Sequence, residues 1–290
     1  MNNNAALANR LTRLFKCTVQ SFRATENIPG ELVISGKVIT NLEPLGGYHK
    51  PATTKAGRLS LSGTLSGGPR VKVFSSFGYK QLALRLAVQQ LQPIAGLHFP
   101  RVLAFDDHFI AEEWIEGAPL KKQPLAHLQT ASNTVSEFLQ ACAIDASLQH
   151  LALQHQSSFC YLDDYLLARL QPWAPWQPVE KLLREWHFAR HEVEKKLPVH
   201  LSHPDLSLAN LVVQRGTSQL FVIDNELLGV GLGWVLDCKN AFISEYSQST
   251  IWDEPTRHFA NLAWRLRLVG SALDAGEFNR AAVIALGDPT

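Results

Sequence analysis

Short segments with strand character fill the first 115 residues of this chain, and long helical segments follow them. Apolar and polar residues alternate at 31–39, 58–64 and 70–74, and the turn-forming residues 66–69 join the last two segments into a predicted β-hairpin. Residues 40–57 have the composition of a loop. Strands first and helices later are typical of an α+β fold, not of one parallel sheet.

Periodicity and breaker residues give the remaining elements. A helix at 79–92 ends before Pro93, and strands at 101–105 and 109–115 flank a turn. Periodic apolar residues predict further helices at 5–16, 133–156, 178–197, 257–271 and 276–286. We therefore expect a small, mainly antiparallel β lobe over residues 1–116 and a mainly helical lobe over residues 117–290.

Charge is distributed unevenly along the chain. Residues 1–100 hold 12 Lys and Arg against 3 Asp and Glu, whereas residues 101–290 hold 15 against 23, so the net charge is only +1. A basic first third favours an anionic ligand, although an ordinary solvated surface can have the same composition. The near-neutral total gives no indication of nucleic-acid binding, and we expect none.

Composition and cysteine usage indicate a soluble globular protein. Hydrophobic residues make up 46% and charged residues 18% of the chain. The four cysteines form no Cys-x-x-Cys pair, which favours a reducing compartment over a disulfide framework. The first residues lack a signal-peptide pattern, and no uncharged apolar stretch reaches the ~20 residues that span a bilayer. We expect a cytoplasmic protein without a membrane span.

One polar segment stands out in the second half of the chain. From Leu201 to Asn210 the sequence reads LSHPDLSLAN. Pro204 has a fixed φ and biases His203 away from helical conformation, so Asp205 is expected on a turn. Asn210 comes five residues later and enters a predicted strand.

A strand–turn–strand segment links Asn210 to a second acid. Predicted strands at 211–213 and 220–223 flank a turn near Gly216, and the second strand ends at Asp224. This hairpin would bring Asp224 close to Asn210. Hard oxygen ligands without Cys or His suit Mg²⁺. Phosphoryl transfer needs such a metal together with an acidic group that orients the attacking hydroxyl.

These segments resemble the catalytic and metal-binding segments of the aminoglycoside phosphotransferase and choline kinase branch of the protein-kinase-like superfamily. That branch reads His-Gly-Asp-x4-Asn and then Ile-Asp-Trp-Glu, and this chain has HPDLSLAN and VIDNE in the same order. The resemblance extends to residues 233–237 and back to the segments 99–103 and 111–117, which look like the strands before the family's interlobe hinge. It covers roughly residues 70–240 and implies a two-lobed, protein-kinase-like fold.

The resemblance also implies a function. The chain would transfer the γ-phosphoryl group of ATP or GTP to a hydroxyl of a small molecule or saccharide, with Mg²⁺. Asp205 would be the catalytic base, and His203 would brace the catalytic loop. Asn210 and Asp224 would bind Mg²⁺, and Asp237 would be structural.

Further residues are implied on the nucleotide side. Lys72, in the strand at 70–74, would hold the α- and β-phosphates, and Glu113 and Ile115 would offer backbone groups to adenine. Gly46 and Gly47 are the candidate phosphate loop, although they lack a full Gly-x-Gly-x-x-Gly pattern.

The chain departs from the family pattern at the partner of Lys72. The family pairs this lysine with a Glu on the following helix, but the sequence between Lys72 and Glu112 contains no Glu. The polar residues of that helix that could replace it are Gln81, Gln89 and Gln90.

Two other functions fit parts of the sequence. The missing helix Glu favours a catalytically silent kinase-like binding or scaffold protein, whereas the presence of Asp205, Asn210 and Asp224 argues against it. A protein kinase is the other possibility, but the chain after Asp224 has no activation segment ending in Ala-Pro-Glu. A hydroxylated small-molecule acceptor is therefore expected.

Overall fold

The computed structural model describes residues 29–45, 60–75, 79–157, 160–196, 199–203, 206, 208–231 and 253–287. The chain divides into two compact units. The first contains the described residues up to Gln89, Pro100–Ile115 and Asp274–Gly276; the second contains Gln90–Phe99, Glu116–Leu273 and the residues from Glu277 on. The helix predicted at 5–16 lies outside the described residues.

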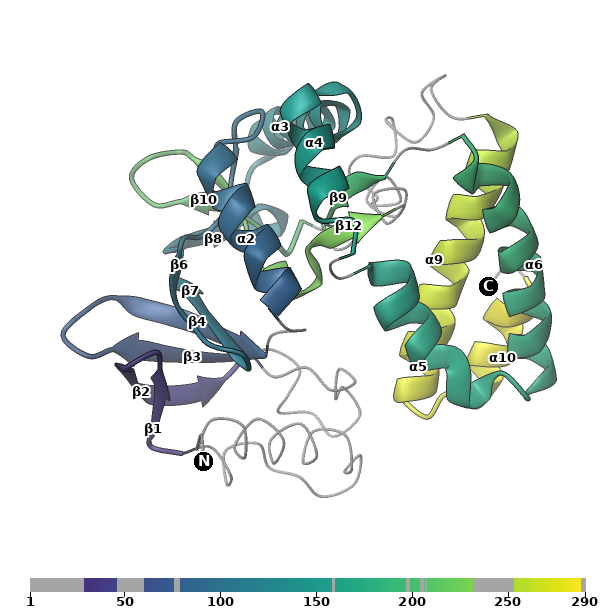
Figure 1. Ribbon diagram of the computed structural model, residues 1–290, viewed down its shortest axis with the longest axis horizontal. Coiled ribbons are helices and arrows are strands. Elements are labelled where there is room, and N and C mark those ends of the chain that lie inside the picture. Colours follow the sequence, from purple (N-terminus) through teal and green to yellow (C-terminus); the bar gives the residue numbers. More distant parts are fainter. Residues whose placement is uncertain are drawn as a thin grey trace. The chain divides into compact units, whose positions relative to one another are not determined.

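The first unit is built on a six-stranded sheet in the order β1-β2-β3-β4-β7-β6, with every neighbouring pair antiparallel (Figure 1). The predicted antiparallel sheet is thus confirmed. Its strands are β1 (Glu31–Ile34), β2 (Lys37–Pro44), β3 (Ser60–Leu65), β4 (Arg70–Ser75), β6 (Val102–Phe105) and β7 (Phe109–Glu113).

The two faces of this sheet are covered differently. Because side chains alternate along a strand, Val71 and Val73 of β4 lie on one face, where they join an apolar cluster drawn from β1, β2, β3, β6 and β7. Phe74 lies on the other face and packs with Ile110 against Leu82 of helix α2 (Tyr79–Leu91). Lys72 shares the α2 face with Phe74, because the two residues are two positions apart in β4.

A hairpin replaces the single strand predicted at 31–39. Ser35 and Gly36 have positive φ values of 48° and 79°, and the chain reverses there so that Ile34 pairs with Lys37. Such two-residue turns match the right-handed twist of the paired strands. Strand β2 then continues to Pro44, into the region predicted as loop. The turn was not predicted because the alternation of apolar and polar residues continues across Ser35 and Gly36.

The second unit contains two small sheets. The larger has the order β5-β11-β10-β8, in which β5 pairs with β11 in parallel, and the smaller pairs β9 with β12. The predicted strands at 211–213 and 220–223 are confirmed. The strands are β5 (Leu97–His98), β8 (Gly117–Pro119), β9 (His200–Ser202), β10 (Leu211–Gln214), β11 (Leu220–Val222) and β12 (Gly229–Gly231).

Helices make up most of the second unit, as predicted. Helix α10 lies against α6, and Trp186 of α6 stacks on Phe259 of α9 with both side chains fully buried (Figure 1). The helices are η4 (Leu120–Lys122), α3 (Leu125–Ile144), α4 (Ala146–Gln154), the π-helical η5 (Tyr161–Leu167), α5 (Ala168–Leu170), η6 (Gln171–Trp173), α6 (Gln177–Glu194), η7 (Asn225–Leu227), α9 (Glu254–Asp274) and α10 (Phe278–Leu286).

The single helix predicted at 133–156 is wrong in its start and its continuity. Helix α3 begins at Leu125, and the chain breaks at Asp145 before α4. The Asp145 carboxylate accepts hydrogen bonds from the N–H groups of Ser147 and Leu148, at 2.8 and 3.0 Å. Asp145 is therefore the N-cap of a second helix.

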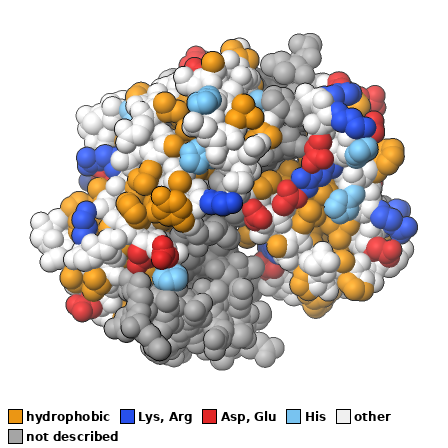
Figure 2. Space-filling view, viewed as in Figure 1, with side chains coloured by type: hydrophobic (Ala, Val, Ile, Leu, Met, Phe, Trp, Pro, Cys, Tyr) orange, Lys and Arg blue, Asp and Glu red, His pale blue; other side chains and the backbone are white. Residues whose placement is uncertain are grey.

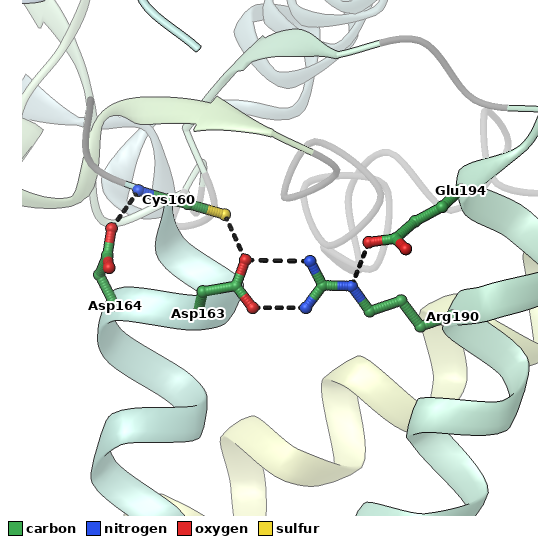
Figure 3. A network of polar contacts seen from close by, with 5 residues as sticks. All are labelled: Cys160, Asp163, Asp164, Arg190 and Glu194. Atoms are coloured by element: carbon green, nitrogen blue, oxygen red, sulfur yellow. Dashed lines mark hydrogen bonds and ion pairs between the residues drawn. The ribbon is translucent and has the colours of Figure 1, made fainter. Parts of the chain in front are cut away.

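A network of charged groups joins η5 to α6 (Figure 3). The Arg190 guanidinium bonds both carboxylate oxygens of Asp163 and also bonds Glu194. The Cys160 thiol donates to Asp163 at 3.3 Å, and burial raises the pKa of this thiol to about 11. Burial alone would raise the pKa of Asp163, but the hydrogen bonds and charge of Arg190 lower it overall. The ionised carboxylate is thus the favoured form.

The surface of the helical unit carries charges of both signs. In Figure 2 basic and acidic side chains are interspersed over α6 and α9, in keeping with the ion pair of Arg184 with Glu180 on α6. None of the helices in the described residues is long and apolar enough to cross a membrane.

The Asp163–Arg190 pair predicts a pH-dependent stability. Since the folded-state pKa of Asp163 lies below the unfolded value of about 3.9, the ionised carboxylate stabilises the fold above about pH 4, and this contribution is lost as the pH falls through the folded-state pKa. Asp163→Asn should lower the free energy of unfolding near pH 7 and lower it progressively less below about pH 4. Urea unfolding across this pH range measures the difference.

Glu277→Gln is the matched control. It breaks the exposed pair with Arg280 and should change the free energy of unfolding by no more than about 1 kcal/mol. An Asp163→Asn effect that is the same at every pH would contradict the assignment of the effect to the ionised carboxylate.

Candidate active site

The β10–β11 hairpin brings two of the predicted site residues to the same end of one ladder. Leu211 pairs with Val222, and the N–H of Ile223 donates to the carbonyl of Asn210 at 2.8 Å. Asn210 is buried, and Asp224 follows the last ladder bond with a half-buried side chain. The ladder therefore places the backbones of Asn210 and Asp224 beside each other.

The backbone of Asp224 is left-handed, with φ 61° and ψ 47°. Asp adopts this conformation more readily than most residues other than glycine. Residues in sparsely populated conformations are enriched at functional sites, because the surrounding structure must hold them there. At Asp224 the chain leaves β11 and enters the short helix η7.

A hydrogen bond of the Asn225 side chain stabilises this turn. Its side chain is fully buried, and its amide nitrogen donates to the carbonyl of Val222 at 3.0 Å. The side-chain oxygen is buried without a hydrogen-bond partner among the residues that the structure describes. The family has Trp at this position, so the sequence signal was a polar residue in place of an aromatic one.

Buried residues fix both ends of the loop that carries Asp205. His203 and Leu206 are both fully buried, and the N–H of Lys121 donates to the carbonyl of Leu208 at 3.1 Å. Asp205 itself lies outside the described residues, and so does Asp237. The position of the Asp205 side chain therefore stays a prediction, while the two residues that flank it closely are anchored.

Strand β9 leads into this loop. Ser202 pairs with Gly229 of β12, and the His200 ring nitrogen lies 2.8 Å from the carbonyl of Cys142 in α3. Burial lowers the pKa of His200, and the bond to Cys142 opposes this only in part. A neutral His200 thus ties β9 to α3.

On the nucleotide side, Lys72 lies in β4 directly opposite Glu112 of β7. Its side chain is 6% exposed, and its Nζ lies 5.6 Å from the centre of the Phe74 ring. Arg85 of α2 forms an ion pair with Glu112 at 2.9 Å, and both side chains are 1% exposed. Lys72 therefore belongs to a buried charged cluster between the sheet and α2.

Sequence reasoning missed both Arg85 and Glu112. It expected a glutamine of the helix to replace the missing Glu, and Gln81 is indeed buried one turn before Arg85. The side-chain amide oxygen of Gln89, in contrast, accepts a hydrogen bond from the N–H of Val102 at 2.7 Å, which ties the helix to β6. The available signal was one charged residue inside the apolar run LALRLAV and two charged residues directly after the apolar residues of FIAEE.

The predicted adenine-contacting residues are partly engaged already. The Glu113 N–H donates to the carbonyl of Arg101 at 2.8 Å, and the Glu113 carboxylate pairs with the Arg101 guanidinium at 3.0 Å. The backbone N–H of Glu113 is therefore already used within the sheet. Ile115 follows two residues later and is buried. Gly46 and Gly47 lie outside the described residues.

The donor atoms at the hairpin end fit Mg²⁺. Asn210 supplies an amide oxygen and Asp224 a carboxylate, and magnesium in phosphoryl-transfer sites is usually held by one or two carboxylates plus substrate phosphates and water. Among the described residues no group of three His, Cys, Asp or Glu side chains is placed to bind a metal. The side-chain types of Asn210 and Asp224 are therefore compatible with Mg²⁺.

Comparison with solved structures shows the fold. The GDP and kanamycin complex of APH(2")-IIia has a TM-score of 0.52 at 15% identity, covering 85% of this chain and 91% of that chain. The apo form of a thermostable mutant of aminoglycoside phosphotransferase APH(4)-Ia has a TM-score of 0.52 at 17% identity, covering 85% and 92%. A ternary complex of another thermostable mutant with AMP-PNP and hygromycin B has a TM-score of 0.50 at 17% identity, covering 85% and 91%.

No protein-family model and no curated protein matches the chain. The structural likeness nevertheless confirms the predicted α+β, protein-kinase-like fold, and with it the predicted resemblance to aminoglycoside phosphotransferases at the level of the fold.

The hydrogen bond of Asn225 predicts a stability cost. Asn225→Ala should lower the free energy of unfolding by about 1–3 kcal/mol, because the buried carbonyl of Val222 loses its donor. Urea unfolding followed by circular dichroism measures this.

Thr217→Ala is the control in the same hairpin. It removes an exposed hydrogen bond to Gln214 and should cost no more than about 0.5 kcal/mol. Equal effects of the two substitutions would show that Asn225 has no special part in holding the turn.

Proposed function

We propose that this protein is a Mg²⁺-dependent phosphotransferase, which moves the γ-phosphoryl group of ATP or GTP to a hydroxyl of a small molecule or saccharide. The observation that carries the proposal is the β10–β11 ladder, which brings Asn210 and Asp224 to the same end of one hairpin, and the burial of His203 just before Asp205 in the sequence supports it. The similar structures that contain GDP with kanamycin, or AMP-PNP with hygromycin B, support a nucleotide and a hydroxylated sugar as the two ligands.

The roles follow from the chemistry of each side chain. Asp205 accepts the proton of the acceptor hydroxyl and orients its oxygen toward the γ-phosphorus. His203, buried at the start of the loop, fixes the backbone on which Asp205 stands. Asn210 and Asp224 hold Mg²⁺, which when bound screens the phosphate charge.

The first lobe, residues 1–116, is proposed to bind the nucleotide, and residues 117–290 to carry catalysis and the acceptor. Lys72 contacts the α- and β-phosphates, and Glu113 and Ile115 face adenine. Gly46 and Gly47 fall in the connection between β2 and β3, the two strands that precede the Lys72 strand. That order supports a phosphate-covering loop at this place. A cytoplasmic location is proposed with it, on the cysteine pattern.

A catalytically silent nucleotide-binding protein is the second candidate. The observation that favours it is α2, which contains no Glu and whose buried charged residue is Arg85. Turnover separates the two candidates, since a silent protein binds nucleotide without consuming it. A protein kinase is the third candidate, and transfer to a protein instead of a small molecule would identify it.

A nucleotide-consumption screen tests the proposed function. ATP and GTP are each supplied with Mg²⁺ and pools of aminoglycosides, sugars, amino alcohols and lipid-linked saccharides. Consumption that depends on one pool supports the proposal and leads to the acceptor. Tight nucleotide binding without consumption in any pool supports the silent candidate.

Asp205→Asn is expected to keep the fold and nucleotide affinity but to slow transfer by about 10²- to 10⁴-fold, because it removes the general base. Asp224→Asn should instead weaken Mg²⁺ binding, so excess Mg²⁺ restores part of its activity and none of the activity of Asp205→Asn. Steady-state transfer and calorimetric nucleotide binding are measured in parallel.

The same substitution at an exposed acid, Asp107→Asn, is the control and should leave transfer unchanged. Wild-type turnover by Asp205→Asn would remove Asp205 from the mechanism.

A further inference from the structure

We propose that Glu112, a strand residue, is the carboxylate that positions Lys72 for the nucleotide phosphates, and that Arg85 of α2 fixes this carboxylate in place. The inference rests on the proposed function, because it assigns Lys72 a nucleotide to hold. It addresses what takes the place of the helix Glu, which this chain lacks after the Lys72 strand.

The register of β4 and β7 places Lys72 beside Glu112. Lys72 and Glu112 are directly paired in the antiparallel ladder of β4 and β7. Directly opposite residues have Cβ atoms about 4.5–5.5 Å apart on the same face of a sheet. The Glu112 carboxylate is therefore within reach of the Lys72 ammonium without any contribution from the helix.

All three charged side chains are buried. Glu112 and Arg85 are 1% exposed and Lys72 is 6% exposed. Buried charges are stable only when they are paired or hydrogen-bonded. Glu112 bonds Arg85 through one oxygen, Oε2, at 2.9 Å. A carboxylate has about four acceptor positions, so it can hold an ammonium as well as this guanidinium.

Arg85 is anchored by a second group besides Glu112. Its guanidinium also donates to the carbonyl of Pro100 at 3.3 Å, so two groups outside the helix hold it. The helix residue thus acts on Lys72 indirectly, by fixing the orientation of Glu112. Arg85 and Glu112 are positioning residues, since neither is expected to touch the nucleotide.

The cluster of Lys72, Arg85 and Glu112 has a net positive charge. The three side chains together comprise two cations and one carboxylate, so an anion that reaches Lys72 is favoured electrostatically. A Glu on the helix in place of Arg85 would reverse this balance. The polarity of the helix residue therefore agrees with a strand carboxylate and an anionic ligand such as a nucleotide phosphate.

A double-mutant cycle on nucleotide affinity tests the proposal. The Kd of ADP with Mg²⁺ is measured by calorimetry for the wild type, Lys72→Ala, Glu112→Gln and the double variant. Glu112→Gln should weaken binding by about 10- to 100-fold, the change expected when a hydrogen bond to a charged group is lost. In the Lys72→Ala background it should weaken binding by less than about 2-fold, because Glu112 acts through Lys72.

Two further variants keep the result interpretable. Glu31→Gln makes the same change at an exposed acid of the same sheet and should leave affinity unchanged. If Glu112→Gln fails to fold because Arg85 is left buried without its ion pair, the cycle is repeated in the Arg85→Gln background, where Glu112→Gln should again weaken binding only when Lys72 is present.

An equal loss of affinity in both Lys72 backgrounds would show that Glu112 is only structural and would overturn the proposal. Wild-type affinity in Glu112→Gln would overturn it as well, and would leave the proposed function intact. A wild-type protein that binds neither ADP nor GDP would overturn the proposed function together with this inference.

Discussion

The candidate site depends on the backbone ladder between β10 and β11. Asn210 and Asp224 are far apart in the sequence and become neighbours because the hydrogen bond of Ile223 with Asn210 closes the ladder at their end. Ladder hydrogen bonds join backbone N–H and C=O groups, so they set the spacing of the two backbones directly. The buried amide of Asn225 then holds the left-handed turn at Asp224.

In the first unit, desolvation is the corresponding constraint. Burying Arg85 against the sheet requires a carboxylate nearby, and Glu112 supplies it from β7. The strand rather than the helix thus carries the negative charge. This arrangement explains how α2 can lack any Glu and still cover the face on which Lys72 lies.

Elements with a clear local signal could be predicted from the sequence. The hairpin of β3 and β4, helix α2 and the β10–β11 hairpin were predicted nearly to their ends, because periodicity and turn residues coincide there. The turn at Ser35 and Gly36 was missed because the alternation of apolar residues continues across it. The break at Asp145 was missed because an N-cap inside a periodic stretch looks like one more polar helix residue.

In the candidate site, only residues of one short segment could be proposed from the sequence, whereas pairs formed across the fold could not. His203, Asn210 and Asp224 were proposed from their order in this segment and from the family resemblance, and their roles remain predictions. The pairing of Arg85 with Glu112 joins a helix to a strand 27 residues away, and only the register of β4 and β7 brings Lys72 into the same cluster. Chain spacing carries no information about such a register.

The path of the chain between the two compact units has a consequence for dissecting the protein. Residues 90–99 belong to the second unit, and β5 within them pairs with β11, although the residues on either side belong to the first unit. No single cut therefore leaves both units intact. A cut before Pro100 removes β6 and β7 from the sheet of the first unit, and a cut after Pro100 leaves β5 on the fragment that lacks β11 or divides the second unit elsewhere. Separate expression of the two units would therefore require a rearranged order of the chain segments, not a truncation.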